Sequence, residues 1–177
     1  MDTTPDEALL AQFLKGDTAA LGELARRYER PLLGLAAALL DGRTDMAADA
    51  IQETWVRVIR FGSRFNARSA FKTWLYRIAI NQCRTAKKRA TDSPGSAGES
   101  VRLPTPQDEA LDDLPHLRDA LRALAPDRRI IILLCYHRGM THEQAADILG
   151  TPVGTLKTRR RAAMTELRAK LHAETQP

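Results

Sequence analysis

The stretch from Thr91 to Asp108, TDSPGSAGESVRLPTPQD, limits the folds open to this sequence more than any other feature. Pro, Gly and Ser are frequent in it, and it has too few apolar residues to bury. Such a composition predicts a flexible linker. The 177 residues then divide into two parts, each long enough for one small hydrophobic core. We therefore expect a domain at 1–90, a linker at 91–108 and a second domain at 109–177.

Helical signals fill both parts, and the sequence has no alternating strand pattern. In the first part, four residues are placed to cap helices: Thr4, Asp17, Asp45 and Ser69. The second of these helices is expected to continue through PLLGLAAALL despite Pro31. The third helix has an apolar face made of Ala47, Ile51, Trp55, Val58 and Ile59.

The second part is expected to form four helices, separated by Pro126, Gly139 and Gly150. Thr141 and Gln144 have the spacing of a capping box at the start of the third of them. The fold class predicted for the whole chain is therefore all-α, with two small helical domains joined by a flexible linker.

Charge is distributed unevenly along the sequence. Residues 1–53 hold ten acids and five bases, whereas residues 54–91 hold ten bases and no acid. A field of one sign over 38 residues indicates an anionic partner, nucleic acid first and an anionic membrane second. PLLGLAAALL is too short to cross a bilayer and the N-terminus does not read as a secretory signal, so we expect no membrane insertion. Two isolated cysteines fit a reduced cytoplasm.

The acid-free interval contains a predicted helix, AFKTWLYRIAINQCRTAKKR, with one apolar and one basic side. The basic side carries Arg77, Asn81, Arg84 and Lys88. Aromatic residues are interleaved with the cations of the interval: Phe65, Phe71, Trp74 and Tyr76. Because bases stack on aromatic rings and phosphates pair with cations, the segment predicts contact with single-stranded or distorted nucleic acid. A solvated charged face is the alternative, and Trp74 fits the hydrophobic core better than a stacking platform.

The segment THEQAADILGTPVGTLKTRR has the spacing of a helix-turn-helix, with a structural helix pair as the alternative. A projection at about 100° per residue separates the faces of its last helix. With Leu156 directed inward, Ala163 and Leu167 share its side. The side chains directed outward are Lys157, Thr158, Arg161 and Thr165. That face can enter a major groove, where Arg and Lys reach guanine acceptors, while Arg160 is expected at the rim of the hydrophobic core.

The sequence offers no catalytic motif, and we expect neither an enzyme nor a cofactor. Cys135, His137 and His142 are close in sequence, but their spacing does not put them on one helix face. Metal ligands must converge on one point, so we expect no metal site.

Three segments in order, DAIQETWVRVIR, FNARSAFKTWLYRIAIN and LRALAPDRRIIILLCYHRGMTHEQAADILGTPVGTLKTRRR, resemble the signature segments of extracytoplasmic-function (ECF) sigma factors. The resemblance covers residues 5–172. It implies that the first domain binds core RNA polymerase and the minus-10 promoter element. It implies that the second reads the minus-35 element and touches the flap of the polymerase beta subunit. It also implies that an anti-sigma factor controls the protein in trans.

The same resemblance assigns roles to individual residues. Those implied to grip the coiled coil of the beta-prime clamp are Asp49, Gln52, Glu53 and Arg57. Those implied to contact the minus-10 element, with a loop at 65–70 that captures a flipped base, are Phe65, Asn66, Arg68, Ser69, Lys72, Arg77, Asn81, Arg84 and Lys88. Those implied to contact the minus-35 duplex are Thr155, Lys157, Thr158, Arg159 and Arg161.

The sequence departs from the family pattern at Met46 and Ala48, where relatives usually carry acids. One hypothesis is that phosphorylation of Thr44 or Thr54 supplies the missing negative charge. Three further departures affect the DNA-facing helices: Thr85, Ala162 and Met164. We therefore expect a promoter preference that differs from that of better matching relatives.

The function predicted is that of a sigma factor, which directs core RNA polymerase to specific promoters. Two alternatives stay open on the residues alone. One is a helix-turn-helix regulator that acts without polymerase, although no dimerisation helix with heptads is found. The other is an adaptor that keeps the protein-binding surface and binds no DNA.

Overall fold

The computed structural model describes residues 4–92 and 114–175. Within these two ranges every regular element is helical. The chain divides into two compact units, Met1–Val101 and Arg102–Pro177, and each is described by itself. The predicted fold class, all-α with two helical domains, is confirmed.

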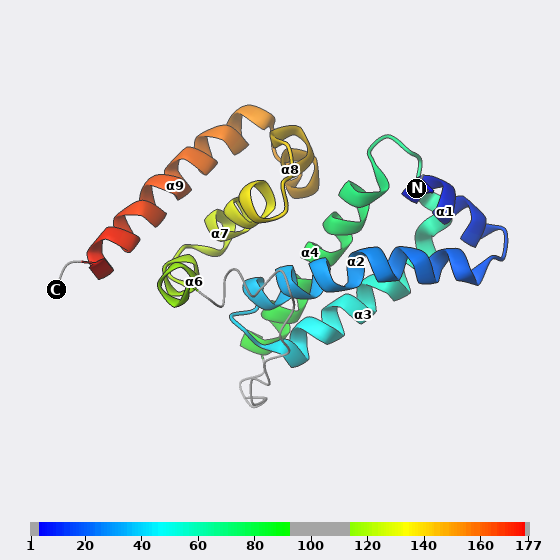
Figure 1. Cartoon of the computed structure of the whole chain (residues 1–177), viewed down its shortest axis with the longest axis horizontal. Helices are drawn as coiled ribbons and strands as arrows, with labels where there is room; N and C mark the ends of the chain where they lie inside the picture. The colour runs from blue at the N-terminus through cyan, green and yellow to red at the C-terminus, as the bar shows by residue number, and fades with distance from the viewer. Residues whose placement is uncertain (1–3, 93–113, 176–177) are drawn as a thin grey trace. The chain divides into compact units, whose positions relative to one another are not determined.

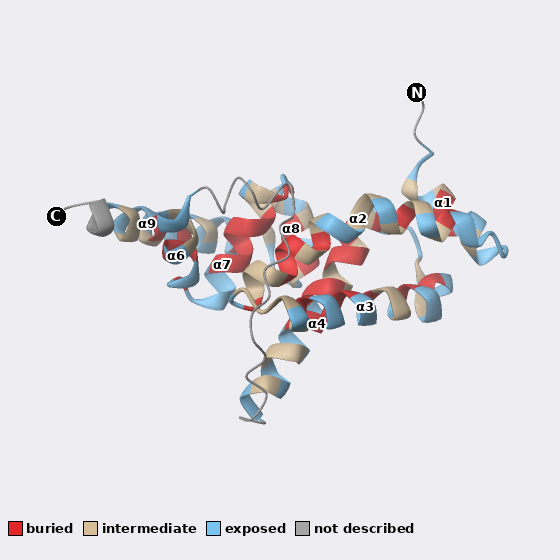
Figure 2. Cartoon of the chain, turned by 60° about the horizontal axis from the view of Figure 1, so that its bottom comes forward, coloured by how far each residue is buried: buried red, intermediate tan, exposed pale blue. Residues whose placement is uncertain are grey.

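The first unit is built from three long helices and two short elements. They are α1 (Asp6–Leu14), α2 (Thr18–Leu39), α3 (Thr44–Phe61), the 3-10 turn η1 (Gly62–Arg64) and α4 (Phe71–Asp92). Helices α2, α3 and α4 pack side by side, and α1 contacts α2, η1 and α4 (Figure 1). In Figure 2 the stretches of ribbon coloured as buried lie where these helices face one another, and the most enclosed apolar residues are Leu24, Leu32, Val58, Phe71 and Leu75. Each such side chain stabilises the fold by roughly 1.5–3 kcal/mol.

Local signals explain some helix starts and miss others. Asp17 caps α2 as predicted, because its side chain accepts a hydrogen bond from the Ala19 amide at 3.0 Å. Helix α2 continues past Pro31, also as predicted. The cap expected at Asp45 is wrong: α3 starts at Thr44, after Arg43 at the N-cap position, where no side chain caps the helix. Likewise the N-cap of α1 is Pro5 rather than Thr4.

Helix α3 is rotated slightly from the orientation that its apolar pattern predicts. Ile59 was expected on the buried face, but it is 51% exposed, whereas Thr54 is fully buried. At 100° per residue, Ile59 lies about 80° from Ile51, and Thr54 lies about 60° away on the other side. The buried side of α3 therefore includes Thr54 and excludes Ile59. The Thr54 hydroxyl satisfies its polarity within the helix, donating to the Ala50 carbonyl at 2.7 Å.

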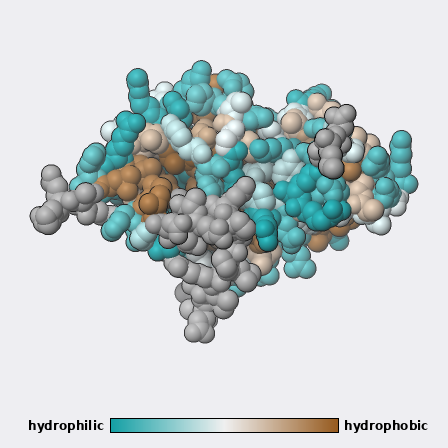
Figure 3. All heavy atoms as spheres, in the orientation of Figure 1, coloured by the Kyte–Doolittle hydropathy of each residue, from teal (hydrophilic) through white to brown (hydrophobic). Residues whose placement is uncertain are grey.

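The second unit is a compact set of short helices closed by one long helix. Its elements are α6 (Pro115–Arg122), α7 (Pro126–Ile132), the π-helical turn η2 (Leu133–His137), α8 (His142–Leu149) and α9 (Val153–Thr175). Helix α9 packs against α6, α7 and α8. A cluster of apolar side chains joins α6 to α9, and Figure 3 shows apolar surface gathered over these two helices. Its partly buried members are Leu117, Met164 and Leu171.

Helix α4 overlaps the first two residues of the predicted linker. Helix α4 extends through Asp92, so Thr91 and Asp92 belong to that helix. Residues 93–108, the remainder of the predicted linker, lie outside the described residues. The domain boundaries at 90 and 109 therefore stay predictions.

Candidate nucleic-acid and protein interfaces

The polar face of α3 carries the residues expected to bind core RNA polymerase. Asp49, Gln52, Glu53 and Arg57 are all exposed. Within the group, Arg57 Nε donates to Glu53 Oε1 at 3.2 Å. An exposed i,i+4 pair of this kind contributes only about 0.3–0.5 kcal/mol, so a partner can compete for either side chain at little cost. The unpredicted exposure of Ile59 adds an apolar side chain near the C-terminal end of the same helix.

The structure tests the phosphorylation hypothesis at one of its two sites. Thr54 is fully buried and its hydroxyl is engaged with Ala50, so a kinase cannot reach it without opening the helix pair. The structure therefore contradicts that part of the hypothesis, because Thr54 was chosen for its position near the missing acids and its burial depends on the packing of α3. Thr44 is partly exposed at the start of α3 and stays a hypothesis.

The loop between η1 and α4, residues 65–70, has a defined conformation. Phe65 is half-buried, with its ring centroid 5.4 Å from that of Trp74 and 6.1 Å from that of Phe71. Asn66 Oδ1 accepts a hydrogen bond from the Arg68 amide at 3.2 Å, which closes a turn around Ala67. Ala67 has φ +54°, in the left-handed region that non-glycine residues rarely adopt. The loop thus presents Asn66 and Arg68 to solvent while its aromatic residue packs inward.

Helix α4 leaves this loop with a solvent-facing basic side, as the sequence predicts. Asn81, Arg84 and Lys88 are exposed, whereas Lys72 and Arg77 are partly buried. Opposite them, Leu75 and Ala79 are buried in the first unit. Trp74 is only partly buried and lies in a ring cluster with Phe65 and Phe71. It is therefore part of the hydrophobic packing beneath the loop, as expected.

Helices α8 and α9 form the helix-turn-helix that the sequence predicts. The capping box is present: the Gln144 amide donates to Thr141 Oγ1 at 3.2 Å, and the Thr141 amide donates to Gln144 Oε1 at 3.0 Å. Gly150 ends α8 with φ +63°, a conformation that favours glycine. Ala145 and Ala146 are buried where the helices pack, so the turn geometry is fixed by residues of small volume.

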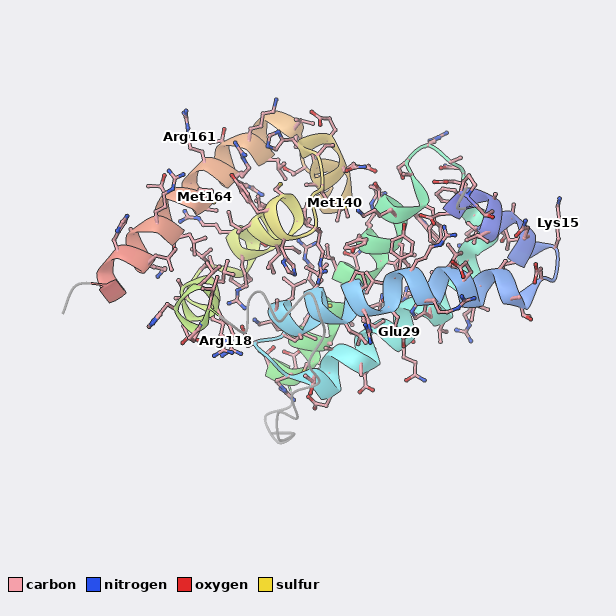
Figure 4. All side chains as sticks on the ribbon, in the orientation of Figure 1. Lys15, Glu29, Arg118, Met140, Arg161 and Met164 are labelled. Atoms are coloured by element: carbon pink, nitrogen blue, oxygen red, sulfur yellow. The ribbon has the colours of Figure 1, made fainter. Side chains whose placement is uncertain are left out.

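The outward face of α9 agrees with the helical projection. Leu156, Ala163 and Leu167 are buried. The residues predicted to contact the minus-35 duplex are all exposed: Thr155, Lys157, Thr158, Arg159 and Arg161. In Figure 4 the Arg161 side chain projects away from the other helices of its unit. The Thr158 hydroxyl donates to the Gly154 carbonyl at 3.1 Å, which leaves its oxygen lone pairs directed at solvent for a donor.

Arg160 differs from its basic neighbours in a way that the sequence predicts only in part. It is half-buried, which confirms the expected position at the rim. Its partner was not predicted: Nη1 lies 3.1 Å from the hydroxyl of Tyr136, and the guanidinium carbon lies 5.8 Å from the centre of that ring. No local signal could have found this pair, because 24 residues separate its members.

Burial suppresses the reactivity of two groups outside these faces. It raises the pKa of the Cys83 thiol to about 12, which keeps that cysteine protonated and unreactive. It also lowers the pKa of His137 to about 4, with a smaller contribution from neighbouring Arg138. Over residues 4–92 and 114–175, no three His, Cys, Asp or Glu side chains gather as a metal site would require. Within the same ranges no helix is long and apolar enough to cross a membrane.

The geometry defines a class of protein, helical over the described residues, with a helix-turn-helix in one unit and a basic helix in the other, as expected of a nucleic-acid-binding protein. Comparison with known proteins identifies the family within this class. Residues 24–92 match the model of sigma-70 region 2, and residues 116–167 match that of sigma-70 region 4.

Two relatives align with most of the chain. The ECF RNA polymerase sigma-E factor of Haemophilus influenzae is 31% identical over 169 residues, which cover 87% of this chain and 88% of the relative. The RNA polymerase sigma-H factor of Pseudomonas aeruginosa is 32% identical over 174 residues, with 87% of each chain covered.

Two solved structures are also similar. CnrH, solved in complex with the cytosolic domain of CnrY, has a TM-score of 0.72 at 26% identity, covering 96% of this chain and 99% of CnrH. The sigma factor RpoE of Bartonella quintana was solved with the anti-sigma factor NepR. It has a TM-score of 0.63 at 33% identity, and the match covers 81% of this chain and 91% of RpoE. The chain belongs to the ECF sigma factors of the sigma-70 family.

Proposed function

We propose that this chain binds core RNA polymerase, directs it to promoters of one sequence class and assists DNA opening, without catalysing a reaction itself. The observation that carries the proposal is the pair of solvent-facing basic surfaces, one on α4 and one on α9, in separate units of one ECF sigma factor. Two basic surfaces in two linked units suit two promoter elements that are read at the same time. The site of action is the bacterial cytoplasm, where transcription takes place.

In this proposal α9 reads the minus-35 duplex. Arg and Lys side chains that extend from the first turns of a helix can reach guanine acceptors in the major groove, and Thr can meet a base or a phosphate. Exposure of Lys157, Thr158 and Arg161 on the side away from Leu156 supports this role. Thr155 and Arg159 flank them and contact the DNA backbone.

The loop at 65–70 and helix α4 bind the minus-10 element. An unpaired base must be held outside the duplex stack, and the phosphates next to it need cationic partners. The loop presents Asn66, Arg68 and Ser69, with the ring of Phe65 at its base. Along α4 the backbone contacts come from Lys72, Arg77, Asn81, Arg84 and Lys88.

The exposed face of α3 binds the clamp coiled coil of the beta-prime subunit, and the second unit touches the beta flap. An inhibitor protein covers these surfaces until a signal releases the chain. Support for such regulation comes from two similar proteins, since CnrH was solved with the cytosolic domain of CnrY and RpoE of Bartonella quintana with the anti-sigma factor NepR.

The test is transcription in vitro with purified chain, core RNA polymerase and a set of genomic promoter fragments. We expect new transcript starts that require both proteins. Replacement of Glu53 by alanine should weaken binding to core polymerase by about tenfold, since a charged contact at an interface is lost. Glu29→Ala is the matched control, because Glu29 is an exposed carboxylate on a different helix, α2 (Figure 4). Binding to promoter fragments without any effect on polymerase would contradict the proposal.

A further inference from the structure

Helix α1 has no role in the function proposed so far. It lies before residue 24, where the match to sigma-70 region 2 begins. It nevertheless contacts both η1 and α4, the two elements that flank the loop at 65–70. Helix α1 is therefore placed to act on both ends of that loop.

The contact with α4 is a hydrogen bond to its first amide. Glu7 Oε1 accepts from the Phe71 amide at 2.7 Å, across 64 residues of sequence. Amides in the first turn of a helix have no partner within the helix, and a carboxylate at that end also interacts favourably with the helix dipole. Phe71 directly follows the loop, so Glu7 fixes the point at which the loop ends.

The contact with η1 fixes the start of the same segment. A Cβ atom at Gly62 would lie 3.3 Å from Leu10 Cδ1 and 3.5 Å from Leu14 Cδ2, so α1 packs closely on this turn. A larger residue at this position would require the end of the Leu10 side chain to shift by a few tenths of an ångström. The two ends of the segment are thus held by one helix.

Helix α1 is itself firmly attached to α2. Arg27 donates to Asp6 Oδ1 at 2.9 Å and to the Thr4 carbonyl at 2.7 Å, and the Tyr28 hydroxyl donates to Asp6 Oδ2. Leu9 and Leu10 are buried beneath the helix. Glu7 therefore acts from a rigid support rather than from a mobile terminus.

We propose that Glu7 is a positioning residue for base capture: from α1 it holds the end of the loop at 65–70 in the conformation that receives the flipped minus-10 base. This inference rests on the proposed function of that loop. A loop already held in its binding conformation loses less conformational entropy when the base enters. The turn at Asn66 and the left-handed Ala67 show that the free loop is already shaped.

Three substitutions of Glu7 distinguish the effect of its side-chain length from the effect of its charge. Glu7→Gln keeps the length of the side chain and an acceptor oxygen, Glu7→Asp keeps the charge but is one methylene shorter, and Glu7→Ala removes both. Glu29→Gln changes net charge by the same amount on an exposed part of α2 and serves as the control.

Each full-length variant is measured in two ways. Amide hydrogen exchange of the free protein reports protection at the start of α4. With core polymerase, a promoter that carries 2-aminopurine at the non-template minus-10 position reports base unstacking, alongside affinity for core polymerase and the unfolding midpoint.

We expect Glu7→Ala and Glu7→Asp to accelerate exchange at Phe71 and to reduce base unstacking by about fivefold, the ratio expected for one lost hydrogen bond. Glu29→Gln should match the wild type, and affinity for core polymerase should not change. Glu7→Gln should show a clearly smaller effect than Glu7→Ala and Glu7→Asp, because it keeps the acceptor and loses only the interaction with the helix dipole.

Unchanged exchange and unstacking in Glu7→Ala would overturn the inference. So would loss in Glu7→Gln with retention in Glu7→Asp, which would indicate charge rather than reach. A parallel loss of core affinity and base unstacking would reduce Glu7 to a purely structural role. If the wild type opens no promoter, the proposed function fails, and the exchange measurement alone decides whether Glu7 holds the loop.

Discussion

Neighbouring cations on α9 have different surroundings, and this difference determines which of them can meet DNA. Arg161 is exposed, whereas Arg160, one residue earlier, is half-buried against Tyr136. Pairing with a hydroxyl and a ring face restrains Arg160 close to its own unit. The basic run of the sequence is therefore not a uniform DNA-binding face.

The first prediction concerns Lys157, Arg159 and Arg161. Arg161→Ala should weaken binding to a minus-35 duplex by about 1–3 kcal/mol and relax specificity at one base pair, as expected for an arginine that reads guanine. Lys157→Ala should also weaken binding and relax specificity, because it removes the second cation of the base-reading face, whereas Arg159→Ala should lower the slope of the salt dependence by about one, because its contact is a phosphate. Fluorescence anisotropy across a salt series measures both effects.

A control lies on the same helix. Arg168 is also exposed on α9, but about two turns beyond Arg161. Arg168→Ala removes the same charge and should cost clearly less affinity. Equal losses for all four variants would show that α9 contributes only its overall charge.

The second prediction is a pH dependence that comes from His137. Burial lowers the pKa of His137 from 6.5 to about 4 in the folded chain, so the unfolded chain binds a proton more readily between these values. The stability associated with neutral His137 is complete above pH 6.5 and falls as the pH drops toward 4. Urea unfolding at several pH values should show a shallower decline for His137→Gln. Parallel curves for variant and wild type would refute this origin.

At the scale of single elements, the turn between α8 and α9 depends on backbone conformation rather than on space. A Cβ atom would meet nothing within 4 Å at Gly150 or at Gly154, yet only Gly150 has a positive φ. Gly154 lies in the first turns of α9. Substitution of Gly150 therefore tests backbone strain, and substitution of Gly154 tests helix propensity.

The third prediction follows from that contrast. Gly150→Ala should destabilise the protein by about 1–2 kcal/mol, because alanine is strained in the left-handed region. Gly154→Ala should stabilise it by about 0.5–1 kcal/mol, because alanine favours the helix. Thermal unfolding of the two variants measures the difference. Two shifts of the same sign would contradict the conformational explanation.

At the scale of the whole molecule, each unit has its own hydrophobic core and its own match to a sigma-70 region. We therefore expect each core to form without the other unit. Binding is different, because two linked units that engage adjacent sites raise each other's effective concentration.

The fourth prediction tests this division. Fragments 1–101 and 102–177 should each unfold cooperatively, and we expect the first to bind core polymerase and the second to bind minus-35 duplexes. An equimolar mixture should occupy a promoter about 10²–10⁴-fold less tightly than the intact chain, since the link is lost. Circular dichroism and footprinting provide the measurements. A fragment that stays unfolded would show that the two cores depend on each other.

The sequence by itself determined what depends on neighbours within a few turns. Helical periodicity placed Leu156 inward and Lys157 and Arg161 outward, because a helix of known pitch converts spacing into direction. Local hydrogen-bonding chemistry predicted the Thr141–Gln144 capping box and the αL end of α8 at Gly150. The basic side of α4 followed from the same reasoning.

Only the tertiary structure decided which borderline positions are buried and which distant groups meet. Thr54 is enclosed and Ile59 exposed because packing against α2 and α4 sets the rotation of α3, which its own pattern leaves ambiguous by tens of degrees. Glu7 meets Phe71, and Arg160 meets Tyr136, across separations of 64 and 24 residues. Such pairs leave no periodic trace in the sequence, since they exist only once the helices have packed.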